Sequence, residues 1–189
     1  MRAGLWLLAG LLLGQAAWAG EVLLTVVERH GDRYRVEVDT RMRATPERIR
    51  GLLIDFPNLG RINDSIHTVE VVRQTGVTGW RIRTQSTICV AFVCREIRQT
   101  QDVIQSPDGD LVATVLPEES DFSYGVARWY FFGEPGTTRM RFIAEVEPAF
   151  WVPPLIGPWL IQRALRQEAL KSVQNLERLA EAPNNDARP

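Results

Sequence analysis

Residues that could carry catalysis or bind a metal are scarce in this sequence, which has two cysteines, Cys89 and Cys94, and two histidines, His30 and His67. Neither histidine lies near the cysteines in sequence, and a metal site would need further ligands. The sequence has no nucleophile elbow, no phosphate-binding glycine loop and no paired-histidine metalloprotease motif. We therefore predict neither a metal site nor a cofactor.

The two cysteines flank a stretch of four apolar residues, which we call the apolar tip. It consists of Val90, Ala91, Phe92 and Val93. If the two central residues form a hairpin turn, Cys89 and Cys94 become a cross-strand pair, where side chains come close together. We therefore predict a structural disulfide, with a redox-active pair or a metal site as alternatives. The tip either packs under a neighbouring element or makes transient contact with a membrane or a partner.

The first 19 residues have the pattern of a secretory signal peptide. Arg2 precedes an apolar run over residues 5–13, and Ala17-Trp18-Ala19 is a small-x-small cleavage site. The run is shorter than the roughly 20 residues that a membrane-spanning helix needs. We predict cleavage after Ala19 and export to the periplasm, with a retained membrane anchor as the alternative.

Length and charge indicate one domain over residues 20–182, followed by a disordered polar tail over residues 183–189. The formal net charge is −1, from 22 basic and 23 acidic residues. A nearly neutral chain has no overall attraction to nucleic acid, so we expect no nucleic-acid partner. We expect the protein to be a monomer.

Alternation of apolar and polar residues predicts an antiparallel sheet. The pattern is clearest in the second segment, where Tyr34, Val36 and Val38 share one face while arginines and acidic residues share the other. Turn residues separate the segments. The expected strands cover residues 21–28, 33–44, 66–74, 79–88, 93–104, 110–116, 122–132 and 138–147.

Two helices are expected in addition. Thr45 suits an N-cap and Pro46 the first helical position of a short helix ending near residue 55, and residues 58–64 form a second short helix or a loop. Apolar or small residues recur at steps of three and four through residues 155–182, which predicts a long helix with one buried stripe. That stripe must pack against the sheet, and its alanines leave either close packing or an empty space.

This order of elements and several short strings resemble one known superfamily. The strings are Val36-Glu37-Val38, Ala44-Thr45-Pro46, Leu52-Leu53-Ile54-Asp55-Phe56-Pro57, Asn63-Asp64 and Asn175-Leu176-Glu177. The chain is similar to the START-like helix-grip superfamily (SRPBCC), and most similar to its polyketide cyclase/dehydrase and coenzyme Q-binding branch. The resemblance implies an α+β fold, in which a curved antiparallel sheet wraps around a long C-terminal helix. It also implies a hydrophobic cavity, and implies an activity far less strongly.

We therefore expect an exported protein that binds or carries a hydrophobic small molecule, such as a lipid, an isoprenoid or a quinone. The cavity would lie between the sheet and the last helix, with residues 150–159 as a gate. The expected lining consists of Trp80, Ile82, Tyr124, Arg128, Met140, Phe142, Trp159, Leu165 and Ala169. Arg128 would bind a carboxylate or phosphate head bidentately, and Gln99 and Gln101 are further possible polar anchors.

Three alternatives stay open from the sequence. Alternation does not distinguish a hollow interior from a filled core. A cyclase/dehydrase-like enzyme would need an inward-facing titratable side chain, for which Tyr124, Glu96 and His67 are candidates. A third possibility is an interaction module with a filled core, which acts through the apolar tip.

Overall fold

A computed structural model describes residues 21–90, 93–151 and 158–182 of the chain. The expected signal peptide, the polar tail, the centre of the apolar tip and most of the expected gate lie outside these residues. The elements in chain order are β1 (Glu21–His30), β2 (Arg33–Met42), α1 (Pro46–Ile54), the 3-10 helix η1 (Phe56–Arg61), β3 (Ile66–Gln74), β4 (Gly79–Val90), β5 (Val93–Gln105), β6 (Leu111–Val115), the 3-10 helix η2 (Pro117–Glu119), β7 (Phe122–Glu134), β8 (Thr137–Pro148) and α2 (Pro158–Glu181).

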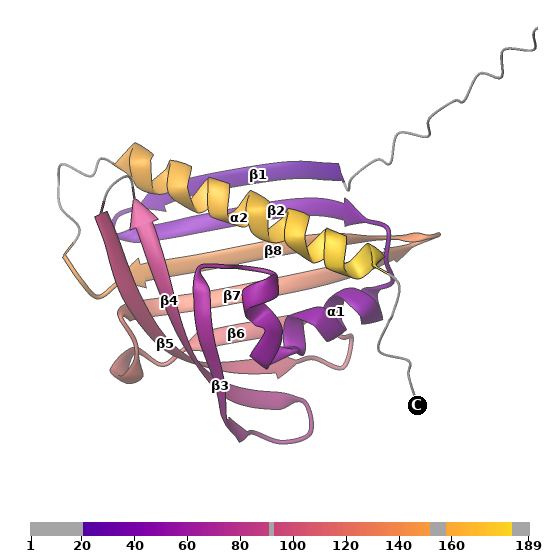
Figure 1. Ribbon diagram of the computed structural model, residues 1–189, viewed down its shortest axis with the longest axis horizontal. Helices are drawn as coiled ribbons and strands as arrows, with labels where there is room; N and C mark the ends of the chain where they lie inside the picture. The colour runs from indigo at the N-terminus through magenta and orange to yellow at the C-terminus, as the bar shows by residue number, and fades with distance from the viewer. Residues whose placement is uncertain (1–20, 91–92, 152–157, 183–189) are drawn as a thin grey trace, which may run out of the picture.

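The strands form one eight-stranded antiparallel sheet in the order β1-β2-β8-β7-β6-β5-β4-β3. Helix α2 crosses one face of this sheet, contacting β1 and β2 on one side and β4 on the other (Figure 1). We call the face toward α2 the inner face and the opposite one the outer face. The architecture confirms the expected α+β helix-grip fold.

Local signals set the short helix as expected. The Thr45 side chain accepts a hydrogen bond from the backbone N–H of Arg48 at 3.3 Å, and Pro46 occupies the first helical position. This cap satisfies a donor that the helix itself leaves without a partner. The short helix and η1 together place Ile49 and Phe56 against the inner face, where both are buried.

Strand β7 differs from the expected alternation because its register shifts between Phe122 and Tyr124. After this shift Gly125 pairs with Val146 and Trp129 with Phe142, so these residues lie on the inner face. A side-chain carbon at Gly125 would collide with Val115, which is why the position takes glycine. An extra residue in a strand reverses the face of every residue that follows it.

The shift places Tyr124 and Arg128 on the outer face, where they pair with Glu147 and Ile143. Arg33 stacks over the Tyr124 ring at 4.0 Å. The expectation that Tyr124 and Arg128 share a face with the cavity is therefore wrong. Trp129 occupies the inner position instead.

The outer face of β2 and β8 carries a network of arginine and carboxylate side chains centred on Asp39. Its side chain is only 2% exposed. Arg139 binds both carboxylate oxygens at 2.7 and 2.8 Å, and Arg141 binds Oδ2 at 3.0 and 3.2 Å. These guanidinium groups, Arg139 first, hold the pKa of Asp39 below its ordinary value. The network therefore joins β2 to β8 on the face of the sheet that points away from α2.

Replacement of Asp39 by asparagine tests how much this network stabilises the sheet. The variant keeps the shape of the side chain but leaves two guanidinium groups without their anion. We expect a loss of about 2 kcal/mol in the free energy of unfolding at neutral pH, measured by urea denaturation. Asp32→Asn is the control, since Asp32 is 85% exposed and its ion pair with Arg29 lies at the surface.

The stabilisation that Asp39 provides should change with pH in a defined direction. A carboxyl whose folded pKa is depressed stabilises the protein above its unfolded pKa of about 3.9, and that stabilisation is lost as the pH falls through the folded pKa. The difference between Asp39→Asn and the wild type should therefore shrink below about pH 4. An equal difference at neutral and acidic pH would contradict this role of Asp39.

Candidate functional site

Helix α2 is packed unequally along its length. In its C-terminal half, Val173, Leu176 and Leu179 are 7%, 2% and 5% exposed and enclosed by the core. In its N-terminal half, every residue from 159 to 172 keeps some exposure to solvent, including the stripe residues Leu165 and Ala169. The apolar stripe of α2 is therefore buried against the sheet in the C-terminal half of the helix and partly exposed to solvent in the N-terminal half.

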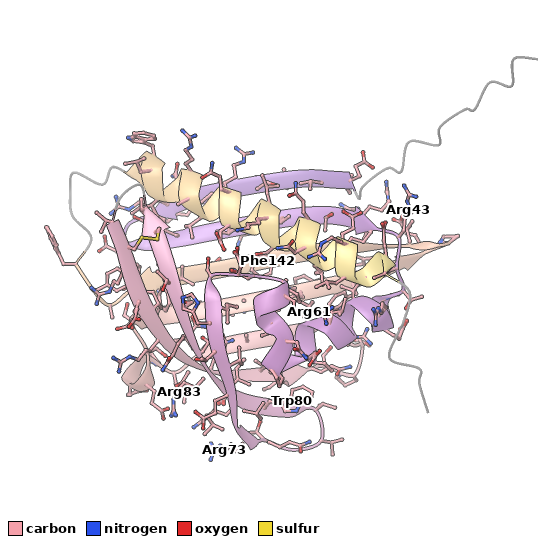
Figure 2. The ribbon with its side chains drawn as sticks, viewed as in Figure 1. Arg43, Arg61, Arg73, Trp80, Arg83 and Phe142 are labelled. Atoms are coloured by element: carbon pink, nitrogen blue, oxygen red, sulfur yellow. A yellow bond between two sulfur atoms is a disulfide. The ribbon has the colours of Figure 1, made fainter. Side chains whose placement is uncertain are left out.

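Inner-face side chains of the sheet beneath the N-terminal half of α2 are also partly exposed to solvent. Trp129, Phe142 and Val146 lie on the inner face, yet all three stay partly exposed. Phe142 from the sheet and Leu165 and Ala169 from the helix border the same buried cluster of Val36, Val38 and Val173, and the Phe142 ring lies 5.1 Å from that of Trp129. Figure 2 shows Phe142 beneath α2. Because solvent reaches apolar groups on both layers, we call this region the inner space, bordered by Trp129, Phe142, Val146, Leu165 and Ala169.

One polar patch interrupts the apolar inner face. Gln99 and Gln101 lie on the inner face of β5, opposite Thr84 and Ile82 of β4. The Gln99 side chain donates a hydrogen bond from Nε2 to Oε1 of Gln101 at 2.5 Å. Thr84 donates from its hydroxyl to the Gln99 backbone carbonyl at 3.3 Å. Both glutamines are partly exposed.

Polar contacts fix α2 over the sheet from its third turn onward. Arg166 donates to the Thr25 carbonyl at 2.9 Å, at the β1 edge. On the opposite side the helix reaches the segment between η1 and β3. There Ser65 donates to Glu168 at 2.6 Å, Lys171 binds Asp64 at 2.6 and 2.8 Å, and Asn175 donates to the Ile62 carbonyl at 3.1 Å. In the described helix these contacts begin at Arg166, so the first turn lacks them.

The end of the molecule where α2 begins, which we call the entrance, carries several aromatic side chains. Arg95 stacks over the Phe150 ring at 4.2 Å, and Phe150 packs on a buried cluster that includes Ile97 and Phe122. Beside this cluster Trp151 is 75% exposed, and Trp159 at the start of α2 is 63% exposed. Large exposed aromatic residues therefore flank the entrance.

The predicted lining residues divide into three groups. Trp80, Ile82 and Met140 lie on the inner face but in packed regions: Trp80 contacts the Phe56 ring at 5.5 Å, and the other two are 1% and 2% exposed. Phe142, Leu165 and Ala169 border the inner space, and Trp159 lies at its entrance. Tyr124 and Arg128 lie on the outer face.

Sequence reasoning did not select Trp129 as a lining residue. Strand β7 is aromatic on both faces, with Tyr130 and Phe132 on one and Trp129 and Phe131 on the other. Neither face could therefore be assigned from hydrophobicity. Gly125 was the available signal, because it marks a close approach of the strand to a neighbour.

None of the three titratable side chains considered for catalysis faces the inner space. His67 is exposed and hydrogen-bonds the Thr87 hydroxyl at 2.8 Å, and Glu96 is exposed opposite Thr87 on the outer face. Tyr124 is likewise on the outer face. Burial raises the pKa of Glu177, but this residue lies in the packed half of α2. The described residues contain no cluster of metal-binding side chains.

Two further sequence predictions concern covalent structure and membranes. Cys89 and Cys94 form a disulfide as predicted, with Val90 paired to Val93 at the hairpin end. Over residues 21–90, 93–151 and 158–182, no helix combines the length and the apolarity that crossing a bilayer requires.

The curved antiparallel sheet, the short helices after β2 and the long terminal helix define the START-like helix-grip fold. No protein-family model and no curated protein matches the chain. Solved structures with this fold do. The Zhui aromatase/cyclase from a Streptomyces species aligns with a TM-score of 0.65 at 14% identity, covering 79% of this chain and 94% of that one.

Two further neighbours have the same architecture. A START superfamily protein from Mycobacterium smegmatis aligns with a TM-score of 0.62 at 16% identity, covering 78% of this chain and 97% of that one. A STAR-related lipid transfer protein from Xanthomonas axonopodis aligns with a TM-score of 0.60 at 9% identity, covering 84% and 99%. At such low identities the likeness establishes the fold alone.

Proposed function

We propose that this protein binds an apolar small molecule, such as a lipid, an isoprenoid or a quinone, in the inner space and carries it as a monomer. The observation that supports this proposal most directly is that apolar side chains of α2 and of the inner face of β7 and β8 stay partly exposed to solvent. The same helix is fully packed only a few residues later. Apolar surface enclosed on two sides favours an apolar ligand, which replaces water there.

The names of the structural neighbours support two uses of this fold. One neighbour is called an aromatase/cyclase and another a lipid transfer protein. We favour the carrier over the enzyme, because Tyr124, Glu96 and His67 all lie away from the inner space. An apolar pocket with a few neutral polar groups suits binding without chemistry.

Transient membrane contact belongs to this proposal. Trp151, Trp159, Ile88 and Val93 are exposed at the entrance, and Arg95 adds a positive charge. Figure 1 shows the start of α2 at the same end as the β4–β5 hairpin. Tryptophan favours the membrane–water interface, and Val90 and Val93 of the apolar tip lie at that end. Docking there would place the entrance against the lipid source.

Filling the inner space tests the proposed binding function. Ala169, Phe142 and Leu165 border the same buried cluster, so Ala169→Phe adds a ring where we propose that the ligand lies. We expect binding of the neutral probe N-phenyl-1-naphthylamine, followed by fluorescence, to weaken by about tenfold or more. Gln167→Phe is the matched control, because Gln167 lies on the exposed face of the same helix. Unchanged binding by Ala169→Phe would refute the proposed location.

Export to the periplasm is a separate part of the proposal. It is supported by the signal-peptide pattern of residues 1–19 and by the Cys89–Cys94 disulfide, since disulfides persist in oxidising compartments. Cell fractionation followed by N-terminal sequencing should find the chain outside the cytoplasm and starting at Gly20. A chain that keeps residues 1–19 in the cytoplasm would contradict this part alone.

A further inference from the structure

We infer that the inner space selects ligands with an uncharged polar head, a carbonyl or a hydroxyl group, which Gln99 and Gln101 hold by hydrogen bonds. This inference rests on the proposed function and names the class of ligand.

The glutamine pair is set in apolar surroundings. On β5 it lies between Ile97 and Val103, which are 2% and 5% exposed. In the neighbouring strands Gln101 pairs with Ile82 and with Val115, which are 1% and 7% exposed. Polar side chains in such a setting need hydrogen-bond partners, because an unmade hydrogen bond costs free energy there.

The hydrogen bond between the two glutamine side chains leaves other donor and acceptor atoms of their amides unused. Each glutamine amide can donate two hydrogen bonds and has an acceptor oxygen. One donor of Gln99 and one acceptor site of Gln101 are used internally. Among the described residues, the Gln99 Oε1 and the Gln101 Nε2 atoms have no further partner. The pair therefore presents an acceptor and a donor side by side, which suits a neutral hydroxyl or carbonyl group.

The charges around the pair disfavour an ionised head. On the described inner face of β4 to β8, Arg95 is the one charged side chain, and it stacks over Phe150. It is four positions from Gln99, which is about 13 Å along a strand. Glu168 of α2 is itself anionic and is bonded to Ser65. Of the α2 cations, Arg166 is bonded to the Thr25 carbonyl and Lys171 to Asp64, so a carboxylate or phosphate beside the glutamines would lose water while these two charges are already bonded elsewhere.

The position of Arg128 also argues against an ionised head group. From the sequence, this guanidinium was the expected anchor for an anionic head. Its place on the outer face, opposite Ile143, removes it from the interior. The polar groups shown next to the glutamines are neutral, the Thr84 hydroxyl and the amides themselves, while the charged Arg95 lies further along β5.

A competition experiment distinguishes the head groups. Dodecanol, 2-dodecanone and ionised dodecanoate would displace N-phenyl-1-naphthylamine from the wild type and from Gln99→Met and Gln101→Met. Methionine keeps the length of the side chain without its amide. Gln85→Met is the control, because Gln85 is exposed on the outer face of β4.

We expect the wild type to bind the alcohol and the ketone at least about tenfold more tightly than dodecanoate. In the two inner-face variants, affinity for the alcohol and the ketone should fall about tenfold while the probe binds as before. The control should match the wild type.

Three outcomes would overturn the inference. Equal alcohol affinity in all variants would show that the glutamines do not hold the head, with the proposed function intact. Tighter binding of dodecanoate by the wild type, which needs no variant to fold, would refute the neutral class. Failure of the wild type to bind the probe or any competitor would refute the proposed function, and the inference with it.

Discussion

The structure depends on how one long helix rests on a curved sheet. Helix α2 must bury an apolar stripe, and its C-terminal half does so with Val173, Leu176 and Leu179. Polar contacts to the β1 edge and to the segment before β3 hold the helix at a fixed height above the central strands. Although it is held at both sides, the helix leaves Trp129 and Phe142 only partly buried.

The fold could be predicted from local patterns that tertiary packing did not override. The alternation in β2, the Thr45–Pro46 helix start and the cysteine hairpin all specify structure within a few residues, and each prediction is confirmed. Strand β7 could not be predicted in the same way. Hydrophobicity does not reveal its bulge next to Phe122, because the strand has aromatic residues on both faces, so the predicted face of Tyr124 and Arg128 is wrong.

The candidate site was predicted only in part, for a related reason. Phe142, Leu165 and Ala169 follow from the periods of a strand and a helix, which specify direction. Periodicity says nothing about the distance between two layers, so it could not separate Met140, which is buried, from Phe142, which is accessible. Gln99 and Gln101 were visible in the sequence as polar residues on an apolar face. They are the remaining candidates for a polar anchor, because Arg128 lies on the outer face.

The central claim is that the space beneath the N-terminal half of α2 holds an apolar ligand with a neutral head. Native mass spectrometry of the protein, purified gently from its natural host, tests this claim most directly. We predict a species heavier than the polypeptide by one small organic molecule, which solvent extraction recovers and identifies as an uncharged alcohol, ketone or quinone. Repeated preparations at the bare polypeptide mass, or an extracted anionic lipid, would contradict it.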